Sequence, residues 1–298
     1  MKTDPRMDSI RLVALDFDGT VMVYPDPTGV FHPDIIRAIN ALEALGIRWC
    51  TNSGRDIIDQ KVVLERSRMA GLTHPPDALI CSESFVYLRC GSEYEPLQPW
   101  NFDAESRLSR CSREARAALE PHLPRWASDF PGLFYVEQGL FPALRAADEG
   151  AQAEALFMEV RRVTANIPRV FVSRNGCWVA VLPEGLGKGP SLSAYAKARG
   201  FGPDHILAVG DHQNDLSMLD GRHAGLVGCP ADAHPDIREI VLRAGGIVAT
   251  SAGPEGTLEI LDALLRARAQ PNECALCDAE NTSEPADAGP AARTPHIP

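Results

Sequence analysis

The stretch RLVALDFDGT, at residues 11–20, decides the fold class of this 298-residue chain. An apolar run over residues 10–15 stops at Asp16, a pattern typical of a buried strand that ends at a polar edge. Residues 33–45 then place apolar side chains at helical spacing, with a proline in the first turn and a glycine after the end. A strand followed by a helix is therefore the first unit of the chain.

The alternation of strand and helix continues on both sides of a different middle region. Strands are expected at 47–50, 78–81, 206–209, 224–227 and 247–249, and helices at 56–70, 191–199, 215–219, 235–244 and 255–266. Such alternation predicts a parallel sheet covered by helices on both faces, which is a Rossmann-like, doubly wound α/β core.

Residues 84–183 interrupt this rhythm. Helices are expected there at 112–119 and 151–164, and strands at 133–136, 170–172 and 178–182. We interpret this segment as an inserted α+β domain with an antiparallel sheet, so that the core consists of residues 1–83 and 184–268. Residues 269–298 are rich in Pro, Ala, Glu, Asp and Thr without periodicity, and we expect a disordered tail there.

Charge and composition exclude several classes of protein. The net charge of −11 argues against a general nucleic-acid binder, which needs a surplus of Lys and Arg. No apolar stretch approaches the roughly 20 residues of a membrane helix, and residues 1–9 lack the pattern of a secretory signal. We therefore expect a cytoplasmic protein without nucleic-acid or membrane partners, whose eight cysteines stay reduced. The role of the Cys274/Cys277 pair in the tail and the oligomeric state stay open.

Polar residues gather where an open parallel sheet binds its ligands, beyond the carboxyl ends of its strands. The segments are Asp16-Phe17-Asp18-Gly19-Thr20, Thr51-Asn52-Ser53-Gly54-Arg55, Gly210-Asp211-His212-Gln213-Asn214-Asp215, and Lys188 between two glycines before a helix. Taken singly, each has a structural explanation as a turn, a helix cap or a solvated helix start. Their occurrence together and in this order favours one shared site.

The carboxylates of Asp16, Asp18, Asp211 and Asp215 are too many negative charges for one small site unless a cation holds them together. Mg²⁺ prefers hard oxygen ligands and usually keeps waters and a substrate phosphate oxygen, so we expect Mg²⁺ as the cofactor. Lys188 is one of only four lysines in an Arg-rich chain, which suggests a need for a compact point charge.

These motifs resemble those of the haloacid dehalogenase superfamily: DFDGT after the first strand, SGR after the second, KG before a helix, and GDxxND after a later strand. The long insert is similar to the large C2-type cap of the branch with Cof-like sugar-phosphate phosphatases. The resemblance covers nearly the whole core but not the insert. It implies that Asp16 gives Mg²⁺ a side-chain oxygen, Asp18 a backbone carbonyl and Asp211 a carboxylate, with Asp215 binding directly or through water.

The resemblance also implies a phosphatase or phosphomutase, because family ATPases carry threonine at the position of Asp18 and dehalogenases lack this aspartate. Asp16 would attack phosphorus and form an aspartyl-phosphate, with Asp18 as general acid and base. Ser53 and Lys188 would stabilise the transferring group. The residues expected to bind the substrate or its phosphate are Gly19, Ser53, Gly54, Arg55, Lys188 and Asn214.

Three positions depart from the family pattern. Ser53 stands where the sugar-phosphate branch mostly has threonine, an exchange that keeps the hydroxyl. The Asn-Gly often found after the third core strand is replaced by Ser82-Glu83-Ser84, and His212 replaces a small residue beside Asp211. The departure after the third strand weakens any transfer of substrate identity from the best-known branches.

The inserted domain is expected to close over the core and to carry specificity. Arg174 and Asn175, between two expected strands, are the candidates for a loop facing the site, and an ordinary hairpin turn is the alternative. The sequence thus predicts Mg²⁺-dependent hydrolysis of a small phosphomonoester, with a sugar phosphate as the expected substrate. A phosphomutase and a non-enzymatic phosphate-binding or scaffold protein are the alternatives.

Overall fold

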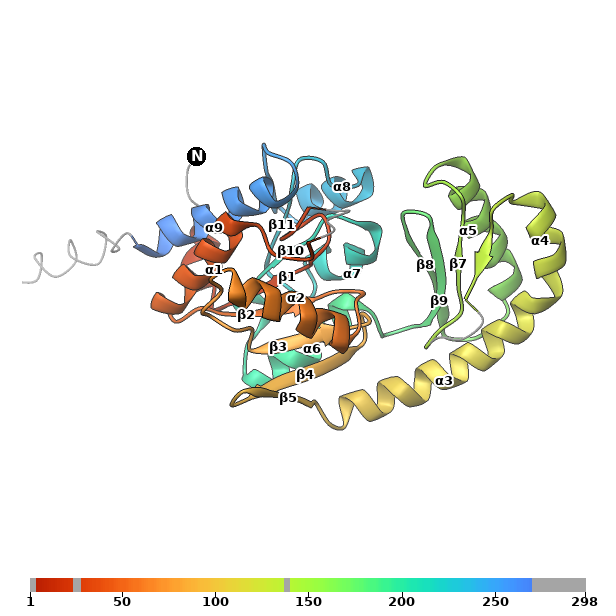
Figure 1. Ribbon diagram of the computed structural model, residues 1–298, viewed down its shortest axis with the longest axis horizontal. Coiled ribbons are helices and arrows are strands. Elements are labelled where there is room, and N and C mark those ends of the chain that lie inside the picture. The colour runs from red at the N-terminus through yellow and green to blue at the C-terminus, as the bar shows by residue number, and fades with distance from the viewer. Residues whose placement is uncertain (1–3, 24–27, 137–139, 270–298) are drawn as a thin grey trace, which may run out of the picture.

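The computed structural model describes residues 4–23, 28–136 and 140–269, which form two sheets with surrounding helices (Figure 1). The larger sheet has the strand order β12-β11-β10-β1-β2-β3-β4-β5. Its strands are β1 (Leu12–Leu15), β2 (Arg48–Asn52), β3 (Ala78–Cys81), β4 (Phe85–Cys90), β5 (Glu93–Pro96), β10 (Ile206–Val209), β11 (Leu226–Cys229) and β12 (Ile247–Val248). The strands from β12 to β3 run parallel, which confirms the predicted α/β core.

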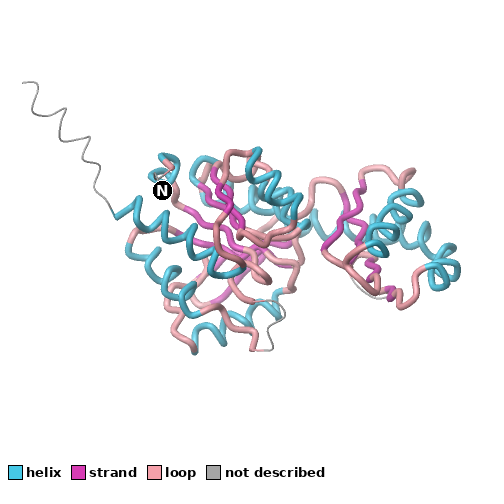
Figure 2. Tube along the Cα trace, turned by 90° about the horizontal axis from the view of Figure 1, so that it is seen from above, coloured by secondary structure: helices cyan, strands magenta, loops and turns pink. Residues whose placement is uncertain are grey.

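Helices cover both faces of this sheet (Figures 1 and 2). One face packs against α1 (Pro33–Ala44), α2 (Ile57–Met69) and α9 (Gly253–Ala269), and the other against α6 (Lys188–Arg199), α7 (Leu216–Leu219) and α8 (Pro235–Arg243). Side chains alternate along a strand, so β1 buries Val13 and Leu15 in the first layer and Leu12 and Ala14 in the second. Short 3-10 helices are η1 (Pro5–Ser9), η3 (Pro203–His205) and η4 (Gln213–Asp215).

The order of the parallel strands fixes the place of the site. The chain leaves β1 toward β2 and β3 on one side, and later returns to β10, on the other side of β1, before reaching β11 and β12. The direction of the connections therefore reverses at β1. Because all these strands end at the same edge of the sheet, the segments that follow β1, β2, β3 and β10 lie close together there.

The start of the inserted domain differs from the sequence-based expectation. We expected the insert to begin at residue 84, but β4 pairs antiparallel with β3, and β5 pairs antiparallel with β4. Both strands therefore extend the main sheet. A chain that turns back directly after a strand can pair with that strand as a hairpin, and residues 82–84 make such a turn. The second sheet belongs to residues beyond β5.

The inserted domain is an antiparallel sheet with helices on one face. Its strand order is β6-β7-β9-β8, with β6 (Phe134–Tyr135), β7 (Ala143–Arg145), β8 (Val170–Asn175) and β9 (Trp178–Pro183). The helices are α3 (Trp100–Leu119), η2 (Glu120–His122), α4 (Leu123–Asp129) and α5 (Ala151–Thr164). Leu119, Trp126 and Leu156 of these helices pack with Val179 and Val181 of β9. The other face of the sheet is turned toward the main sheet (Figure 1).

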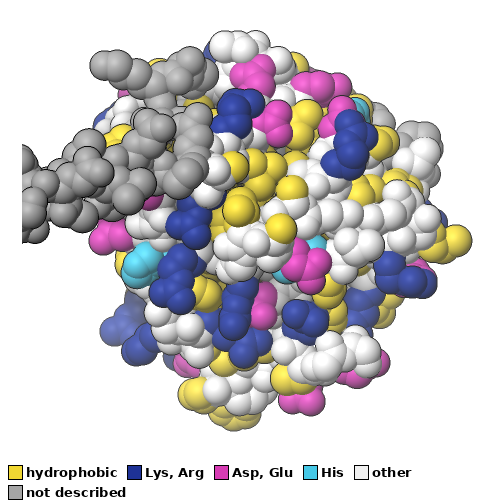
Figure 3. Space-filling view, turned by 90° about the vertical axis from the view of Figure 1, so that its left-hand side faces the viewer, with side chains coloured by type: hydrophobic (Ala, Val, Ile, Leu, Met, Phe, Trp, Pro, Cys, Tyr) yellow, Lys and Arg dark blue, Asp and Glu magenta, His cyan; other side chains and the backbone are white. Residues whose placement is uncertain are grey.

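The side of the core opposite the inserted domain carries basic and acidic side chains around a hydrophobic area (Figure 3). Within the described residues, no helix combines the length and the apolar character needed to cross a membrane. The expected tail, residues 269–298, lies outside the described residues except for Ala269, which ends α9. Cys274 and Cys277 lie outside them as well.

Candidate active site

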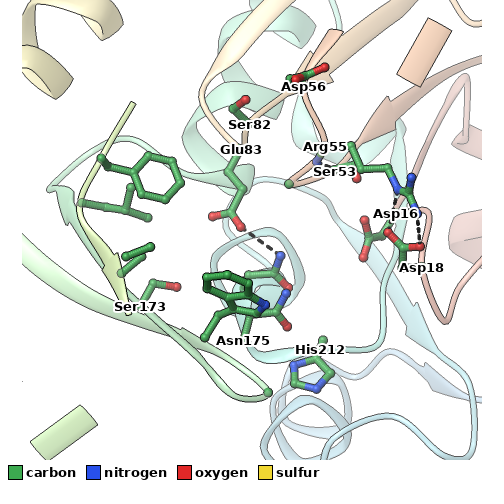
Figure 4. A pocket seen from close by; sticks show the side chains of 18 of the residues that line it. Asp16, Asp18, Ser53, Arg55, Asp56, Ser82, Glu83, Ser173, Asn175 and His212 are labelled. Atoms are coloured by element: carbon green, nitrogen blue, oxygen red, sulfur yellow. Dashed lines mark hydrogen bonds and ion pairs between the residues drawn. The ribbon is translucent and has the colours of Figure 1, made fainter. Parts of the chain in front are cut away.

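The sequence motifs meet at the carboxyl edge of the main sheet (Figure 4). Asp16 follows β1 directly, Ser53 follows β2, and Gly210 separates β10 from Asp211. Lys188 reaches the same edge as the first residue of α6. The structure thus brings together the side chains of Asp16, Asp18, Ser53, Lys188, Asp211 and Asp215.

Three carboxylates form an acidic group at this edge. One oxygen from each of Asp16, Asp211 and Asp215 lies within 4.8 Å of the others. Burial, with the neighbouring carboxylates, raises the pKa of Asp16 well above its usual range, although the Lys188 ammonium opposes the shift. Burial and the charge of Asp215 raise the pKa of Asp211 to about 7. Three hard oxygen donors at this spacing fit a divalent cation such as Mg²⁺, whose charge would offset their repulsion.

Lys188 is a buried cation within this group. Its Nζ lies 2.9 Å from Asp16 Oδ1 and 2.6 Å from Asp215 Oδ1, and the residue has no exposed surface. Burial alone would lower the pKa of this ammonium, but the carboxylates of Asp16, Asp215 and Glu83 outweigh it, and the pKa is raised. Lys188 is therefore charged, holds the Asp16 carboxylate in place and offers positive charge to an incoming phosphoryl group.

The loop after β10 fixes the orientation of Asp215. Its Oδ2 accepts hydrogen bonds from the backbone N–H groups of Asp211 and His212, both at 3.0 Å, while Oδ1 faces Lys188. Gly210 leaves the room for this arrangement, because a Cβ there would lie 2.5 Å from Asp215 Cγ. Any side chain at position 210 would therefore displace the Asp215 carboxylate.

Asp211 is held against the loop that follows β1. Thr20 Oγ1 donates a hydrogen bond of 2.7 Å to Asp211 Oδ1. Gly19 has a φ of +76°, and a Cβ there would lie 2.3 Å from Asp211 Oδ2. Backbone conformation and the space taken by the carboxylate therefore both require glycine at position 19.

Asp18 lies near the mouth of the site and is bound by Arg55 (Figure 4). Arg55 Nε and Nη2 donate to the two carboxylate oxygens at 2.8 and 2.6 Å, which fixes the plane of the carboxylate. The backbone N–H of Arg55 donates to Ser53 Oγ at 3.2 Å. Ser53 and Gly54 line the same pocket. The segment after β2 therefore contributes the Ser53 hydroxyl, the Arg55 guanidinium and, at Gly54, a backbone that no side chain covers.

Glu83 is a residue of this site that the sequence analysis did not identify as one. Its carboxylate lies in the pocket, and its Oε1 accepts a hydrogen bond of 2.9 Å from Asn214 Nδ2 (Figure 4). Burial raises the pKa of Glu83, with the Lys188 ammonium opposing the shift. The sequence showed Ser82-Glu83-Ser84 only as a departure from a family pattern. Its place directly after a parallel strand was the signal that could have identified it.

The turn that carries Glu83 has an unusual backbone conformation. Ser82 and Glu83 have φ values of 46° and 59°, in the left-handed region that costs non-glycine residues about 1–2 kcal/mol each. Their backbone N–H groups donate to the carbonyls of Arg55 and Ser53 at 2.9 and 3.1 Å, and Ser191 Oγ donates to the Glu83 carbonyl at 2.9 Å. Strained conformations fixed by surrounding structure are typical of functional sites.

The inserted domain presents one face of its sheet to the same pocket. Ser173 and Asn175 of β8 and Trp178 and Ala180 of β9 line the pocket. The register pairs Ser173 with Ala180 and Asn175 with Trp178, so all four side chains point to the same side. A hydroxyl, an amide and an indole therefore face the acidic group of the core.

The expectation that Arg174 faces the site together with Asn175 is wrong. Strand β8 continues through both residues, so their side chains point to opposite faces. Arg174 Nη1 lies 2.6 Å from Glu154 Oε2, and Arg174 Nε donates to the Gly176 carbonyl at 3.0 Å. Arg174 thus ties β8 to α5, and Asn175 is the member of the pair that lines the pocket.

The pocket between the two sheets has a volume of about 820 Å³. His212 and Asn214 line it beside the loop after β10. His212 Nδ1 accepts a hydrogen bond of 3.0 Å from the Gln213 N–H, and burial lowers the His212 pKa, which favours the neutral ring. The cavity is large enough for a phosphate together with an organic group.

Comparisons with known proteins establish the family. Residues 140–242 match the family model of haloacid dehalogenase-like hydrolases. The chain is also 36% identical over 267 residues to the phosphoglycolate phosphatase of Aeropyrum pernix, which covers 86% of this chain and 94% of that protein. The chain belongs to the haloacid dehalogenase-like hydrolases. This hydrolase is a phosphatase, as the sequence predicted.

Another relative and two solved structures resemble this hydrolase. The phosphoglycolate phosphatase of Methanospirillum hungatei is 30% identical over 96 residues, covering 32% of this chain and 40% of that protein. The sucrose-phosphatase of Synechocystis, solved with sucrose and phosphate, has a TM-score of 0.61 at 18% identity, covering 86% of this chain and 98% of that one. A haloacid dehalogenase-like hydrolase from B. subtilis has a TM-score of 0.55 at 16% identity, with coverages of 85% and 99%. The two structural likenesses show a shared fold.

Proposed function

We propose that this phosphatase is a Mg²⁺-dependent phosphomonoester hydrolase that forms an aspartyl-phosphate on Asp16. The buried acidic group with its lysine carries the proposal. Asp16 Oδ1 lies 2.9 Å from Lys188 Nζ, and oxygens of Asp16, Asp211 and Asp215 lie within 4.8 Å of one another. A carboxylate nucleophile beside a fixed cation and a set of hard oxygen donors suits phosphoryl transfer, in which catalysis is mainly positioning and charge stabilisation.

Asp16, Asp211 and Asp215 would hold Mg²⁺, together with the backbone carbonyl of Asp18. The bound ion would supply positive charge that screens the repulsion between the Asp16 carboxylate and the phosphate. Lys188 adds a second positive charge, held 2.9 Å from Asp16 Oδ1.

In the first step, an oxygen of Asp16 attacks phosphorus in line with the leaving oxygen. A bond forms between Asp16 and phosphorus as the bond from phosphorus to the leaving oxygen breaks, and Asp18 gives that oxygen its proton. In the second step, Asp18 takes a proton from water, and the water oxygen attacks phosphorus. The bond to Asp16 breaks, inorganic phosphate leaves, and both carboxyl groups return to their starting states.

Several pocket residues are suited to holding the phosphate during these steps. The Ser53 hydroxyl and the Asn214 amide are donors, and the backbone N–H of Gly54 can approach closely because this position lacks a side chain. The Gly19 N–H already donates to the Met22 carbonyl at 3.0 Å, so Gly19 contributes the room that its missing side chain leaves. Arg55 binds both carboxylate oxygens of Asp18 and would thereby position that carboxyl group for proton transfer.

A small phosphorylated metabolite, such as a sugar phosphate, is the proposed substrate. The cavity of about 820 Å³ and its polar lining from Ser173 and Asn175 support a substrate with an organic group beyond the phosphate. The names of the relatives, phosphoglycolate phosphatase and sucrose-phosphatase, support a phosphomonoester.

The proposal is tested by assaying purified protein with phenyl phosphate and measuring inorganic phosphate. We expect turnover with Mg²⁺, loss of turnover after chelation, and recovery when Mg²⁺ is added back. Turnover that persists after complete chelation would contradict the proposed metal dependence. With sugar phosphates, accumulation of an isomeric phosphate without free phosphate would indicate a phosphomutase instead.

A further inference from the structure

The charged side chains that line the pocket are almost all acidic. Of the described residues that line it, seven are Asp or Glu, and Arg55 alone is Lys or Arg. Arg55 Nε and Nη2 bind the two carboxylate oxygens of Asp18. Lys188, beneath the pocket, is engaged by Asp16 and Asp215. A substrate phosphate can use Lys188 and a bound metal ion, but a second anion on the substrate would find no free lysine or arginine in the described lining.

Glu83 lies in the pocket beside the residues proposed to hold the phosphate. Its Oε1 lies 3.5 Å from the position that a Cβ would take on Gly54, beside the second motif. From there the side chain points into the pocket (Figure 4). Oε1 accepts the hydrogen bond from Asn214, whereas Oε2 accepts none from the described residues. One carboxylate oxygen is thus left to accept a hydrogen bond from a ligand.

Hydrogen bonds fix the orientation of the Glu83 side chain. Its backbone is fixed by hydrogen bonds to the Ser53 carbonyl and from Ser191 Oγ. Asn214 fixes the carboxylate end. A side chain held at both ends loses little further freedom when a ligand binds, so it can discriminate between ligands efficiently.

Strands β8 and β9 of the inserted domain supply the other contacts that an uncharged polar group would make in the pocket. Ser173 and Asn175 offer hydrogen-bonding groups, and Trp178, whose ring also contacts the Arg145 guanidinium, offers an indole on the same face of the sheet. Hydroxyl groups satisfy such partners, and the CH groups of a polyol or sugar can lie against an indole. A carboxylate would instead lie beside Glu83, while the arginine on this face of the sheet, Arg145 of β7, lies outside the pocket lining with its guanidinium over the Trp178 ring.

We propose that Glu83 determines the specificity of this phosphatase, by selecting a hydroxyl-bearing, uncharged leaving group and rejecting a carboxylated one. The inference rests on the proposed phosphomonoester hydrolysis and names its substrate class as phosphorylated polyols and sugars. The proposed substrates differ from phosphoglycolate, which gives the Aeropyrum pernix relative its name, because phosphoglycolate carries a carboxylate.

The experiment compares glycerol 3-phosphate with 3-phosphoglycerate, which differ by a hydroxymethyl group in place of a carboxylate. The variants are Glu83→Gln, which keeps an acceptor for Asn214 but removes the charge, and Glu83→Asp, which keeps the charge. Glu105→Gln, an exposed position on α3, is the matched control. We measure kcat/KM for both substrates and for phenyl phosphate, and thermal unfolding checks that each variant is folded.

We expect the wild type and Glu105→Gln to prefer glycerol 3-phosphate. In Glu83→Gln the preference should fall by roughly ten- to hundredfold, the size expected for like charges about 6 Å apart in a partly buried site. Glu83→Asp should retain a preference for glycerol 3-phosphate. A wild type that prefers 3-phosphoglycerate, or an unchanged preference in folded Glu83→Gln, would overturn the role of Glu83 while phenyl phosphate turnover still supported the hydrolase. Absence of turnover with all three substrates would overturn both proposals.

Discussion

Replacement of Lys188 by methionine should destabilise the metal-free protein strongly and abolish most of its activity. Lys188 has no exposed surface, and its Nζ lies 2.9 Å from Asp16 Oδ1 and 2.6 Å from Asp215 Oδ1. Methionine fills a similar volume without the charge, so the two carboxylates would remain buried without their cation. The change therefore tests the electrostatics of the site with little effect on packing.

The expected loss of unfolding free energy is about 3–5 kcal/mol, the range for removing one partner from a buried ion pair. For a protein of this size each kcal/mol lowers the thermal midpoint by about 2–4 °C, so we expect a fall of roughly 6–20 °C. Mg²⁺ should recover part of this loss, because a cation bound to the same carboxylates stabilises the folded state. With Mg²⁺ present, kcat should still fall at least about a hundredfold, since a charged donor to the transferring group is missing.

The assay is thermal and denaturant unfolding of metal-free protein, with and without Mg²⁺. Lys197→Met, on the same helix but exposed, is the matched control and should change stability by less than about 0.5 kcal/mol. The double variant Lys188→Met/Asp215→Asn should be more stable than Lys188→Met alone, because it buries one charge fewer. An unfolding free energy of Lys188→Met within about 0.5 kcal/mol of wild type would refute the reasoning.

Three further predictions concern the neighbouring residues. The pKa of Asp211 is raised from its ordinary value of 3.8 to about 7 in the folded protein, so folding favours its protonated form. The stability this contributes is fully present below about pH 3.8 and is lost as the pH rises from there through about 7. Metal-free protein should therefore be about 1 kcal/mol more stable at pH 6 than at pH 7.5 by denaturant unfolding, and saturating Mg²⁺ should remove the difference. Gly210→Ala places a Cβ 2.5 Å from Asp215 Cγ, so the Mg²⁺ concentration for half-maximal activity should rise about tenfold or more, and an unchanged value would argue against Asp215 as a ligand. Arg55→Lys keeps the charge but loses the two-pronged contact with Asp18, so kcat should fall at least about tenfold. A change in KM alone would assign Arg55 to binding.

Much of the core and its site could be predicted because parallel strands end at one edge. Once residues 10–15 and 206–209 are read as parallel strands, Asp16 and Asp211 must lie near one another, whatever their distance in sequence. The apolar runs that mark such strands are strong signals because both faces of the sheet are buried.

The remaining features depend on geometry that periodicity does not encode. Strand β5 is mostly exposed at the edge of the sheet and lacks the apolar run that reveals a central strand. Strand β4 begins with an apolar run, FVYL, but that run does not tell which of the two sheets the strand joins. The error at Arg174 came from reading the end of a strand as a loop, where alternation no longer decides which side chain faces inward. Glu83 was missed because its importance lies in a left-handed turn that glutamate rarely adopts.

The most direct test of the proposed mechanism is to locate the phosphoryl group during turnover. We would quench a reaction with Mg²⁺ and phenyl phosphate in acid within milliseconds, digest the protein, and identify the phosphorylated peptide by mass spectrometry. The mechanism predicts one phosphate on Asp16 in wild-type protein and none in a folded Asp16→Asn variant. A phosphate on another residue, or undiminished turnover by Asp16→Asn, would contradict it.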